Sequence, residues 1–146
     1  MRCKELLLSC LITGIGAGAF AHEGVKNPAV KARMHAMMTI GANTKALGRM
    51  ANGATPFEAQ AARDAASSIA ESAGQAPALF RLHETDPVSE ARPAIWQNFD
   101  DFEAQLIALE TAAARAAREV ETIDDLRAVL PQIGAGCRTC HRTYRE

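Results

Sequence analysis

The chain has 146 residues, of which 48% are hydrophobic and 23% are charged, and its formal net charge at pH 7 is −1. This length suits a single domain that can bury a core without help from disulfides. A charge so close to zero gives no reason to expect nucleic-acid binding, and no segment beyond the opening is apolar over the length of a membrane span.

The opening of the chain has the pattern of a secretory signal peptide. A short positive segment with Arg2 and Lys4 precedes a mostly apolar stretch, which ends in Ala19-Phe20-Ala21 and so fits the small-x-small cleavage pattern. We therefore predict a signal peptide over residues 1–21 and one mature domain over residues 22–146. The mature protein is expected to be soluble and periplasmic.

The four cysteines fall into two groups. Cys3 and Cys10 lie in the predicted signal peptide, and only Cys137 and Cys140 remain after its removal. An alternative interpretation makes Cys10 the lipid-bearing residue of a lipoprotein, but the apolar region continues past it and too little of that region precedes it. No structural disulfide is expected, because both remaining cysteines belong to a motif described below.

Two helices are predicted in the first half of the domain. The first begins at Asn27-Pro28, an N-cap followed by proline at the first helical position, and ends near Met50. The second follows Thr55, whose side chain can cap it while Glu58 reaches back, and ends near Gly74. On the first helix one face repeats at steps of three and four: Val30, Met34, Met37, Gly41, Thr44 and Gly48.

A long connection over residues 75–92 precedes two more predicted helices. Pro93 opens the third, which keeps a three-four apolar rhythm to about Arg118. Thr122 caps the fourth, with two acidic residues in its first turn, where they favour the positive end of the helix dipole. No stretch alternates with period two. Four helices with two short links and one long one predict an all-α, antiparallel four-helix bundle.

The last predicted helix carries a Cys-x-x-Cys-His motif, Cys137-Arg138-Thr139-Cys140-His141, which is the attachment signature of c-type haem. Two thiols three residues apart lie on one helical face, which suits two vinyl groups on one porphyrin edge, and the imidazole follows as an iron ligand. The alternatives are a redox pair, half of a zinc site, or a disulfide. A redox pair needs a βαβ context and a zinc site needs further ligands, and neither is present. We predict one haem c, bound through Cys137 and Cys140.

Three local motifs together resemble the class II cytochromes c, the family of cytochrome c′ and of the low-spin cytochrome c-556 type. Ala29-Val30-Lys31-Ala32-Arg33 resembles the entry to the family's first helix, and Ala91-Arg92-Pro93-Ala94-Ile95-Trp96 resembles the opening of its third. Ile133-Gly134 with the residues from Cys137 to Arg145 resembles its fourth. The resemblance spans essentially the whole mature chain and is greatest to the c-556 type. It implies a cytochrome c′-like bundle around one haem.

The resemblance also implies which residues face the iron. In cytochrome c′ an apolar side chain four residues after the first-helix arginine closes the distal face, whereas the low-spin branch has a methionine there that binds iron. Counting from Arg33, this position is Met37, so His141 and Met37 are the expected metal ligands. Among the other methionines, Met34 is the better substitute because it lies one turn nearer the N-terminus.

Further positions follow from the same resemblance. Arg33 is expected near the haem edge, where a guanidinium can pair with a propionate. Glu90 falls in the loop that covers one haem edge, and Arg145 lies at a position where the family often has a basic residue. His35 and His83 are expected to be solvated surface residues rather than iron ligands.

These features predict a monohaem electron carrier with low-spin iron, not an enzyme, whose redox partner proteins are unidentified. The protein is expected as a monomer or a homodimer, with the first two helices as the dimer face by analogy with the fold. The alternative is a cytochrome c′-like five-coordinate haem protein that binds nitric oxide or carbon monoxide, which requires the distal site to be open or Met37 to be weakly bound and displaceable. A peroxidase is disfavoured, because no distal histidine with an accompanying base is placed to cleave a peroxide bond.

Overall fold

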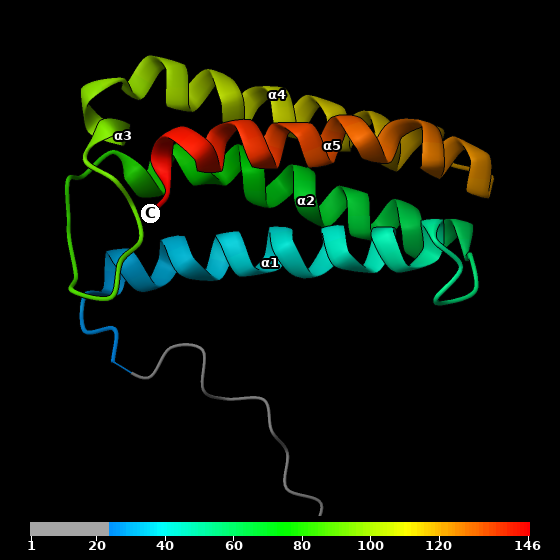
Figure 1. The fold of residues 1–146 in the computed structure, drawn as a ribbon, viewed down its shortest axis with the longest axis horizontal. Coiled ribbons are helices and arrows are strands. Elements are labelled where there is room, and N and C mark those ends of the chain that lie inside the picture. The colour runs from blue at the N-terminus through cyan, green and yellow to red at the C-terminus, as the bar shows by residue number, and fades with distance from the viewer. Residues whose placement is uncertain (1–23) are drawn as a thin grey trace, which may run out of the picture.

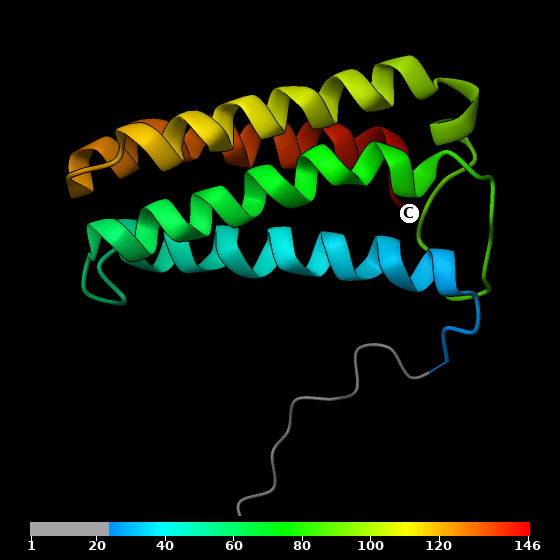
Figure 2. The same ribbon diagram turned by 180° about the vertical axis from the view of Figure 1, so that it is seen from behind.

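The computed structural model describes residues 24–146, so the predicted signal peptide lies outside the described residues. The fold consists of four long helices and one short one: α1 Pro28–Ala51, α2 Ala59–Phe80, α3 Ala94–Gln97, α4 Phe99–Glu119 and α5 Ile123–Tyr144. The long helices lie side by side and alternate in direction (Figures 1 and 2). No β-strand occurs within residues 24–146, and the predicted all-α four-helix bundle is confirmed.

None of the helices in the described part of the chain is long and apolar enough to cross a membrane.

The buried side chains form two clusters along the bundle. In the larger cluster, alanines of α2 and α4 allow these helices to approach closely, and Leu47, Ile69, Leu126 and Ile133 fill the space between the four long helices. The smaller cluster, at the other end, consists of Ala76, Phe80, Ile95, Phe102, Leu106 and Tyr144. Met37 packs against both clusters, and the two cysteines of α5 are divided between them. The region around Met37 is therefore the junction between the two halves of the core.

The second helix is longer than predicted. It continues past Gly74 to Phe80, although Pro77 lies inside it and cannot donate a backbone hydrogen bond. The prediction that this helix ends near Gly74 is wrong, because Ala76 and Phe80 are buried in the smaller cluster and their packing outweighs the local preference.

Two of the three predicted helix caps are present. Asn27 accepts hydrogen bonds from two backbone N–H groups at the start of α1. At the start of α5, Thr122 and Asp125 form a reciprocal capping box. The predicted cap at Thr55 is wrong, because α2 has Glu58 as its N-cap residue and no side-chain capping hydrogen bond. The backbone N–H of Thr55 instead donates to a carbonyl at the end of α1.

The predicted third helix is interrupted. Asn98, with φ −134° and ψ 50°, separates the short α3 from α4, and its backbone and side-chain N–H groups both donate to the carbonyl of Ala94. Asparagine competes in this way for backbone groups that would otherwise continue a helix. The break lets Ile95 enter the smaller cluster and lets the indole N–H of Trp96 donate to the carbonyl of Phe80 at 2.8 Å.

Candidate functional site

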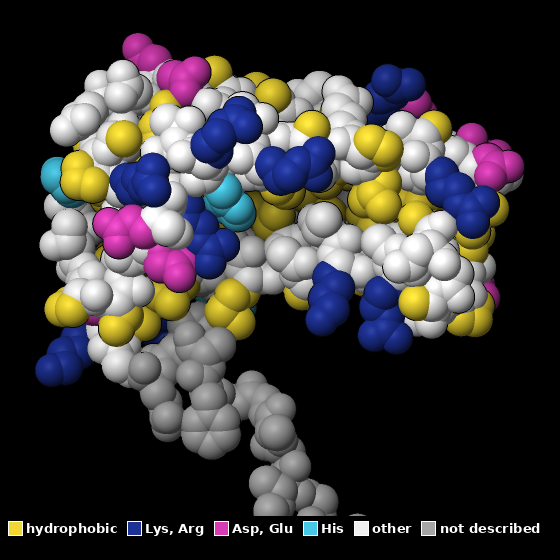
Figure 3. All heavy atoms as spheres, in the orientation of Figure 1, with side chains coloured by type: hydrophobic (Ala, Val, Ile, Leu, Met, Phe, Trp, Pro, Cys, Tyr) yellow, Lys and Arg dark blue, Asp and Glu magenta, His cyan; other side chains and the backbone are white. Residues whose placement is uncertain are grey.

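A cavity of about 750 Å³ lies between α1, α4 and α5, and the connection before α3 closes one of its sides. Cofactor pockets typically have volumes of about 300–1,000 Å³ and mostly apolar walls. Figure 3 shows the opening between α1 and α5, with apolar side chains inside it and a histidine at its mouth. Eight residues that the sequence analysis singled out for the haem site line this one cavity: Arg33, Met34, Met37, Glu90, Cys137, Cys140, His141 and Arg145.

The cysteines of α5 lie in one wall of the cavity. Cys137 and Cys140 are half-buried and free, one helical turn apart. Burial raises the pKa of Cys137. Burial, followed by the charges of Cys137 and Asp101, raises the pKa of Cys140 to about 11. Both thiols are therefore protonated at neutral pH when no group is attached to them.

His141 lies next to these cysteines at the mouth of the cavity. Desolvation by the surrounding protein lowers the pKa of His141, and the nearby positive charge of Arg145 lowers it further, while Glu90 opposes the shift. The neutral imidazole is therefore favoured, which is the form that can bind a metal ion.

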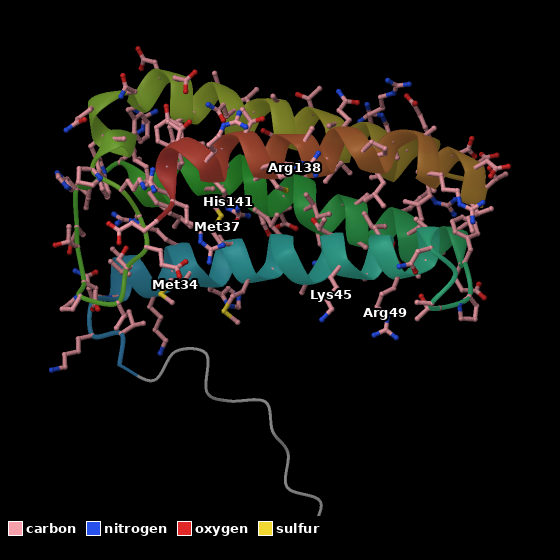
Figure 4. The ribbon with its side chains drawn as sticks, in the orientation of Figure 1. Met34, Met37, Lys45, Arg49, Arg138 and His141 are labelled. Carbon is pink, nitrogen blue, oxygen red and sulfur yellow. The ribbon has the colours of Figure 1, made fainter. Side chains whose placement is uncertain are left out.

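The methionines of α1 lie in the opposite wall. Met37 is half-buried, and Figure 4 shows its side chain in the space between α1 and α5, beside His141. Met34 lines the cavity one turn earlier, and Gly41 lines it one turn later. A Cβ added to Gly41 would meet no atom within 4 Å, so there is open space beside Met37.

The face of the first helix that the sequence predicted from its spacing therefore lines the cavity. It is not the face that packs into the larger buried cluster. All of its members except Gly48 line the cavity. The side chains of α1 that lie in the dry core come mainly from the adjacent face, with Ile40 and Leu47 in the larger cluster.

Arg33 organises the chain that follows α2. Its guanidinium donates to three backbone carbonyls: Nε to Leu79 at 2.8 Å, Nη1 to Glu84 at 2.7 Å, and Nη2 to Leu82. The side chain is only 3% exposed although it borders the cavity. The guanidinium is directed to carbonyls at the end of α2 and in the connection after it, and the expected pairing of Arg33 with a haem propionate stays a prediction.

Aromatic rings complete the surroundings of Arg33. The guanidinium carbon lies 4.9 Å from the ring centre of Phe80 and 5.4 Å from that of Trp96. Burial lowers the pKa of Arg33, and the charge of Glu84 opposes this effect. His83 stacks on the outer side of this group, with its ring centre 4.0 Å from that of Trp96. His83 and His35 are both exposed, and neither lines the cavity.

The connection before α3 is fastened to the end of α5 at the edge of the cavity. Nε of Arg145 donates to Glu90 at 2.6 Å, and the two side chains form an ion pair. Two backbone hydrogen bonds, from Glu146 to Glu90 and from Arg92 to Tyr144, run beside it. Glu90 is thus held at the rim, and nothing in the sequence alone indicated that Arg145 is its partner.

Sequence reasoning missed several polar groups of the cavity. Among the described residues, Thr44 Oγ1 and Gln105 Oε1 are the buried side-chain oxygens without a hydrogen-bond partner, and both residues line the cavity. Tyr144 donates to Asp101 at 2.5 Å. Thr44 belongs to the periodic face of the first helix, but that spacing does not show that its hydroxyl is buried without a partner, and the contact between Tyr144 and Asp101 joins two different helices.

The donor set fits a covalently attached haem. Two free thiols and an imidazole lie on one apolar wall and a thioether lies on the other, and two buried polar atoms at the cavity lack partners. Elsewhere in residues 24–146, no group of three or more His, Cys, Asp or Glu side chains is placed to hold a metal ion by itself.

The amino-acid sequence is similar to that of known proteins over most of its length. Residues 28–145 match the sequence model of the family described as Cytochrome C′. The chain is 34% identical to cytochrome c-556 of Agrobacterium fabrum over 146 residues, which cover 99% of this chain and 97% of the relative.

Two solved structures from Rhodopseudomonas palustris have the same architecture. The chain is similar to oxidised cytochrome c556, with a TM-score of 0.73, 27% identity and coverage of 82% of this chain and 96% of the other. It is also similar to cytochrome c′, with a TM-score of 0.77, 24% identity and coverage of 83% and 98%. The second likeness concerns the fold alone.

Proposed function

Since the chain belongs to the cytochrome c′ family, we propose that it is a periplasmic electron carrier of the low-spin branch, with His141 and Met37 as the axial ligands. The cofactor of this family is haem c, which is covalently attached. We assign the attachment to Cys137 and Cys140. When bound, the haem iron supplies one-electron chemistry between the ferric and ferrous states.

The observation that carries this proposal is the position of Met37. Its side chain lies on α1 in the wall opposite the Cys-x-x-Cys-His motif of α5, in the space that Figure 4 shows beside His141. A thioether is a soft, neutral ligand that suits haem iron and raises its potential relative to a second imidazole. With two protein ligands, the iron needs no exogenous ligand.

Other residues of the cavity support electron transfer by excluding water from the cofactor and by fixing the shape of the cavity edge. Phe102, Leu106 and Leu109 make its inner wall apolar, which keeps water from the cofactor and favours a small reorganisation on electron transfer. The Glu90–Arg145 ion pair holds the connection against α5, so that the edge of the site has a defined shape. Met34 is the substitute ligand in this assignment, and Met37 takes precedence because it lies at the junction of the two core clusters.

A second candidate function is the binding of small gases, and the unbranched, half-buried side chain of Met37 favours it. A flexible methionine can leave the iron and admit carbon monoxide or nitric oxide. Such a protein would sense or carry a gas, and it would not be an electron carrier.

Carbon monoxide binding to the dithionite-reduced protein separates the two candidates. The electron carrier is expected to bind the gas slowly and weakly, because Met37 occupies its site, whereas Met37→Ala is expected to bind it rapidly. The matched variant Met34→Ala should behave like the unmutated protein. Rapid, tight binding by the unmutated protein would contradict the electron-carrier proposal and support the gas-binding one.

A further inference from the structure

Cationic side chains lie on both helices that flank the cavity mouth, and Lys45 is one of the residues that line the cavity. Lys45 and Arg49 extend from α1, and Arg138 and Arg142 extend from α5; we call these four exposed residues the cationic rim. Figures 3 and 4, in the same orientation, show Arg138 on the α5 side of the opening and Lys45 and Arg49 on the α1 side, with His141 further toward the C-terminal end of α5. Within residues 24–146, no carboxylate lies within ion-pair distance of any of the four, since the four ion pairs found there involve other arginines.

The two helices of the rim carry almost no acidic residues. There is none in Pro28–Ala51 of α1, and none in α5 after its first turn. Helix α4, which packs on α2 and α5, has five: Asp100, Asp101, Glu103, Glu110 and Glu119. Since the whole chain has a net charge of −1, the positive charge at the mouth reflects an uneven distribution and not a basic composition. Such a distribution orients a charged partner before contact.

Exposed apolar side chains also line the cavity. Met38 and Val88 both line the cavity, and they are 44% and 46% exposed. An apolar centre surrounded by charged groups is the usual anatomy of a protein–protein interface. Cations and exposed apolar side chains therefore occur together on the face of the molecule where the cavity opens.

We propose that the cationic rim docks an acidic surface of a redox partner protein over the cavity mouth. This inference rests on the proposed electron-carrier function. A partner with carboxylates around its own redox centre complements the four unpaired cations, and its apolar centre would meet Met38 and Val88. Association would be fast at low salt and weak at high salt, because charges at the surface are screened over about 10 Å at 0.1 M salt.

An anionic membrane is the alternative binding partner of the cationic rim, but the exposed side chains of α1 and α5 favour a protein. Binding in the plane of a membrane requires a continuous apolar face on the helix that carries the cations. In the described part of the chain, Met38 is the one large hydrophobic of α1 that is substantially exposed, and no such residue of α5 is.

Flash photolysis of the ferric holoprotein tests the inference with defined probes. The probes are a peptide of glutamates and a peptide of lysines, equal in length, each carrying a ruthenium(II) tris-bipyridine group. On illumination the excited ruthenium(II) gives one electron to the ferric haem, which leaves ruthenium(III) and ferrous haem. We expect the glutamate peptide to react about ten-fold faster than the lysine peptide at low salt, with the difference lost on adding salt.

Charge reversal locates the effect on the surface. Lys45→Glu with Arg49→Glu should slow the reaction of the glutamate peptide about ten-fold, whereas Arg115→Glu with Arg118→Glu on α4, an equal change in net charge, should change it by less than about two-fold. Circular dichroism and the haem spectrum verify that each variant is folded. If the two double variants slow the reaction equally, or if the peptides react at equal rates, the docking inference is wrong while the electron-carrier function stands.

Two further outcomes would also contradict the docking inference. If neither peptide reduces the haem, the proposed function fails and the inference fails with it. Sedimentation with phosphatidylglycerol vesicles tests the alternative binding partner. If the holoprotein binds these vesicles at 0.1 M salt and Lys45→Glu with Arg49→Glu abolishes binding, the rim serves a membrane surface and the assignment to an acidic protein is overturned.

Discussion

Tyr144 is the only tyrosine of the chain, and it lies in the cavity wall on the helix that carries His141. Burial is the main cause that raises the pKa of Tyr144 from its ordinary value of 10.0 to about 12, and its hydrogen bond to Asp101 adds to the effect. The neutral phenol is therefore favoured in the folded protein. Its contribution to stability is complete below pH 10 and is lost as the pH rises through about 12.

A single tyrosine makes this shift directly measurable. Carbon-13 labelling of Tyr144 should give one phenol signal in the nuclear magnetic resonance spectrum, with a titration midpoint near pH 12. In Asp101→Asn the midpoint should fall but stay above 10, because burial remains. A midpoint near 10 in the unmutated protein would show that the hydroxyl is solvated and that the Tyr144–Asp101 contact does not form in solution.

Arg33 gives a prediction about stability. Arg33→Met should destabilise the fold by about 3 kcal/mol, because three part-buried carbonyls lose their donor and each unpaired group costs about 1–3 kcal/mol, partly relieved by water. Arg49→Met is the matched control, since Arg49 is exposed on the same helix, and it should change stability by less than about 0.5 kcal/mol. Denaturant unfolding measures both. Unchanged stability of Arg33→Met, together with a shifted reduction potential, would instead support a propionate partner.

The Cys-x-x-Cys-His motif predicted the attachment residues, and the resemblance to the class II cytochromes c implied Met37, counted from Arg33. Each of these patterns is local to one helix, and neither shows what the other residues of the cavity contact. The hydrogen bonds of Arg33 join residues 46 to 51 positions apart, and the Glu90–Arg145 pair spans 55 positions. Such pairs depend on how the connection folds back over the bundle.

At the scale of single helices, caps were predicted where a local hydrogen bond satisfies the first turn. The reciprocal bonds of Thr122 and Asp125 follow directly from their spacing. The same pattern at Thr55 and Glu58 failed, because the turn after α1 uses the backbone of Thr55 and α2 begins only at Ala59. A capping motif in the sequence therefore predicts a cap only where its residues do not take part in another local structure, such as the turn after α1.

This contrast gives a matched pair of substitutions. Thr122→Ala should destabilise the protein by about 1 kcal/mol, because Asp125 loses its partner at the start of α5. Thr55→Ala should have an effect of less than about 0.5 kcal/mol, because its side chain makes no capping hydrogen bond to α2. Thermal or denaturant unfolding of the two variants measures the difference. Equal losses of stability would show that the Thr55 cap forms in solution.

Tertiary packing explains the other differences between the predicted and observed helices. Proline and glycine near residues 74–77 favour an end to α2, yet the helix continues because Phe80 packs edge-to-face on Phe102, with ring centres 4.9 Å apart. The break at Asn98 likewise brings Ile95 and Trp96 inward. Local propensity contributes only fractions of a kcal/mol per residue, and buried aromatic contacts exceed it.

At the scale of the whole molecule, the apolar pattern predicted a four-helix bundle, and the structure shows how the bundle accommodates a site. The core is divided into two clusters, and the cavity lies where they meet, between α1 and α5. The sequence could predict the helices and the motif, because both are periodic. It could not predict the cavity, because a stripe that lines a cavity and a stripe that packs in a core have the same spacing.

The proposed function depends on what occupies the iron's distal side. Met37 and Met34 both line the cavity, and we assign the ligand to Met37 because it lies at the junction of the two clusters. Methionine ligation leaves a specific optical signature, since a sulfur-to-iron charge-transfer band appears only when a thioether binds low-spin ferric iron. The spin state reports whether the sixth position is filled.

The absorption and electron paramagnetic resonance spectra of the ferric protein at neutral pH therefore test the central claim directly. We expect a low-spin signal and a weak far-red charge-transfer band in the unmutated protein. Both should be lost in Met37→Leu, which should become high-spin, and both should be kept in Met34→Leu. A high-spin spectrum of the unmutated protein, or a band that survives in Met37→Leu and disappears in Met34→Leu, would contradict the assignment of Met37 as the ligand.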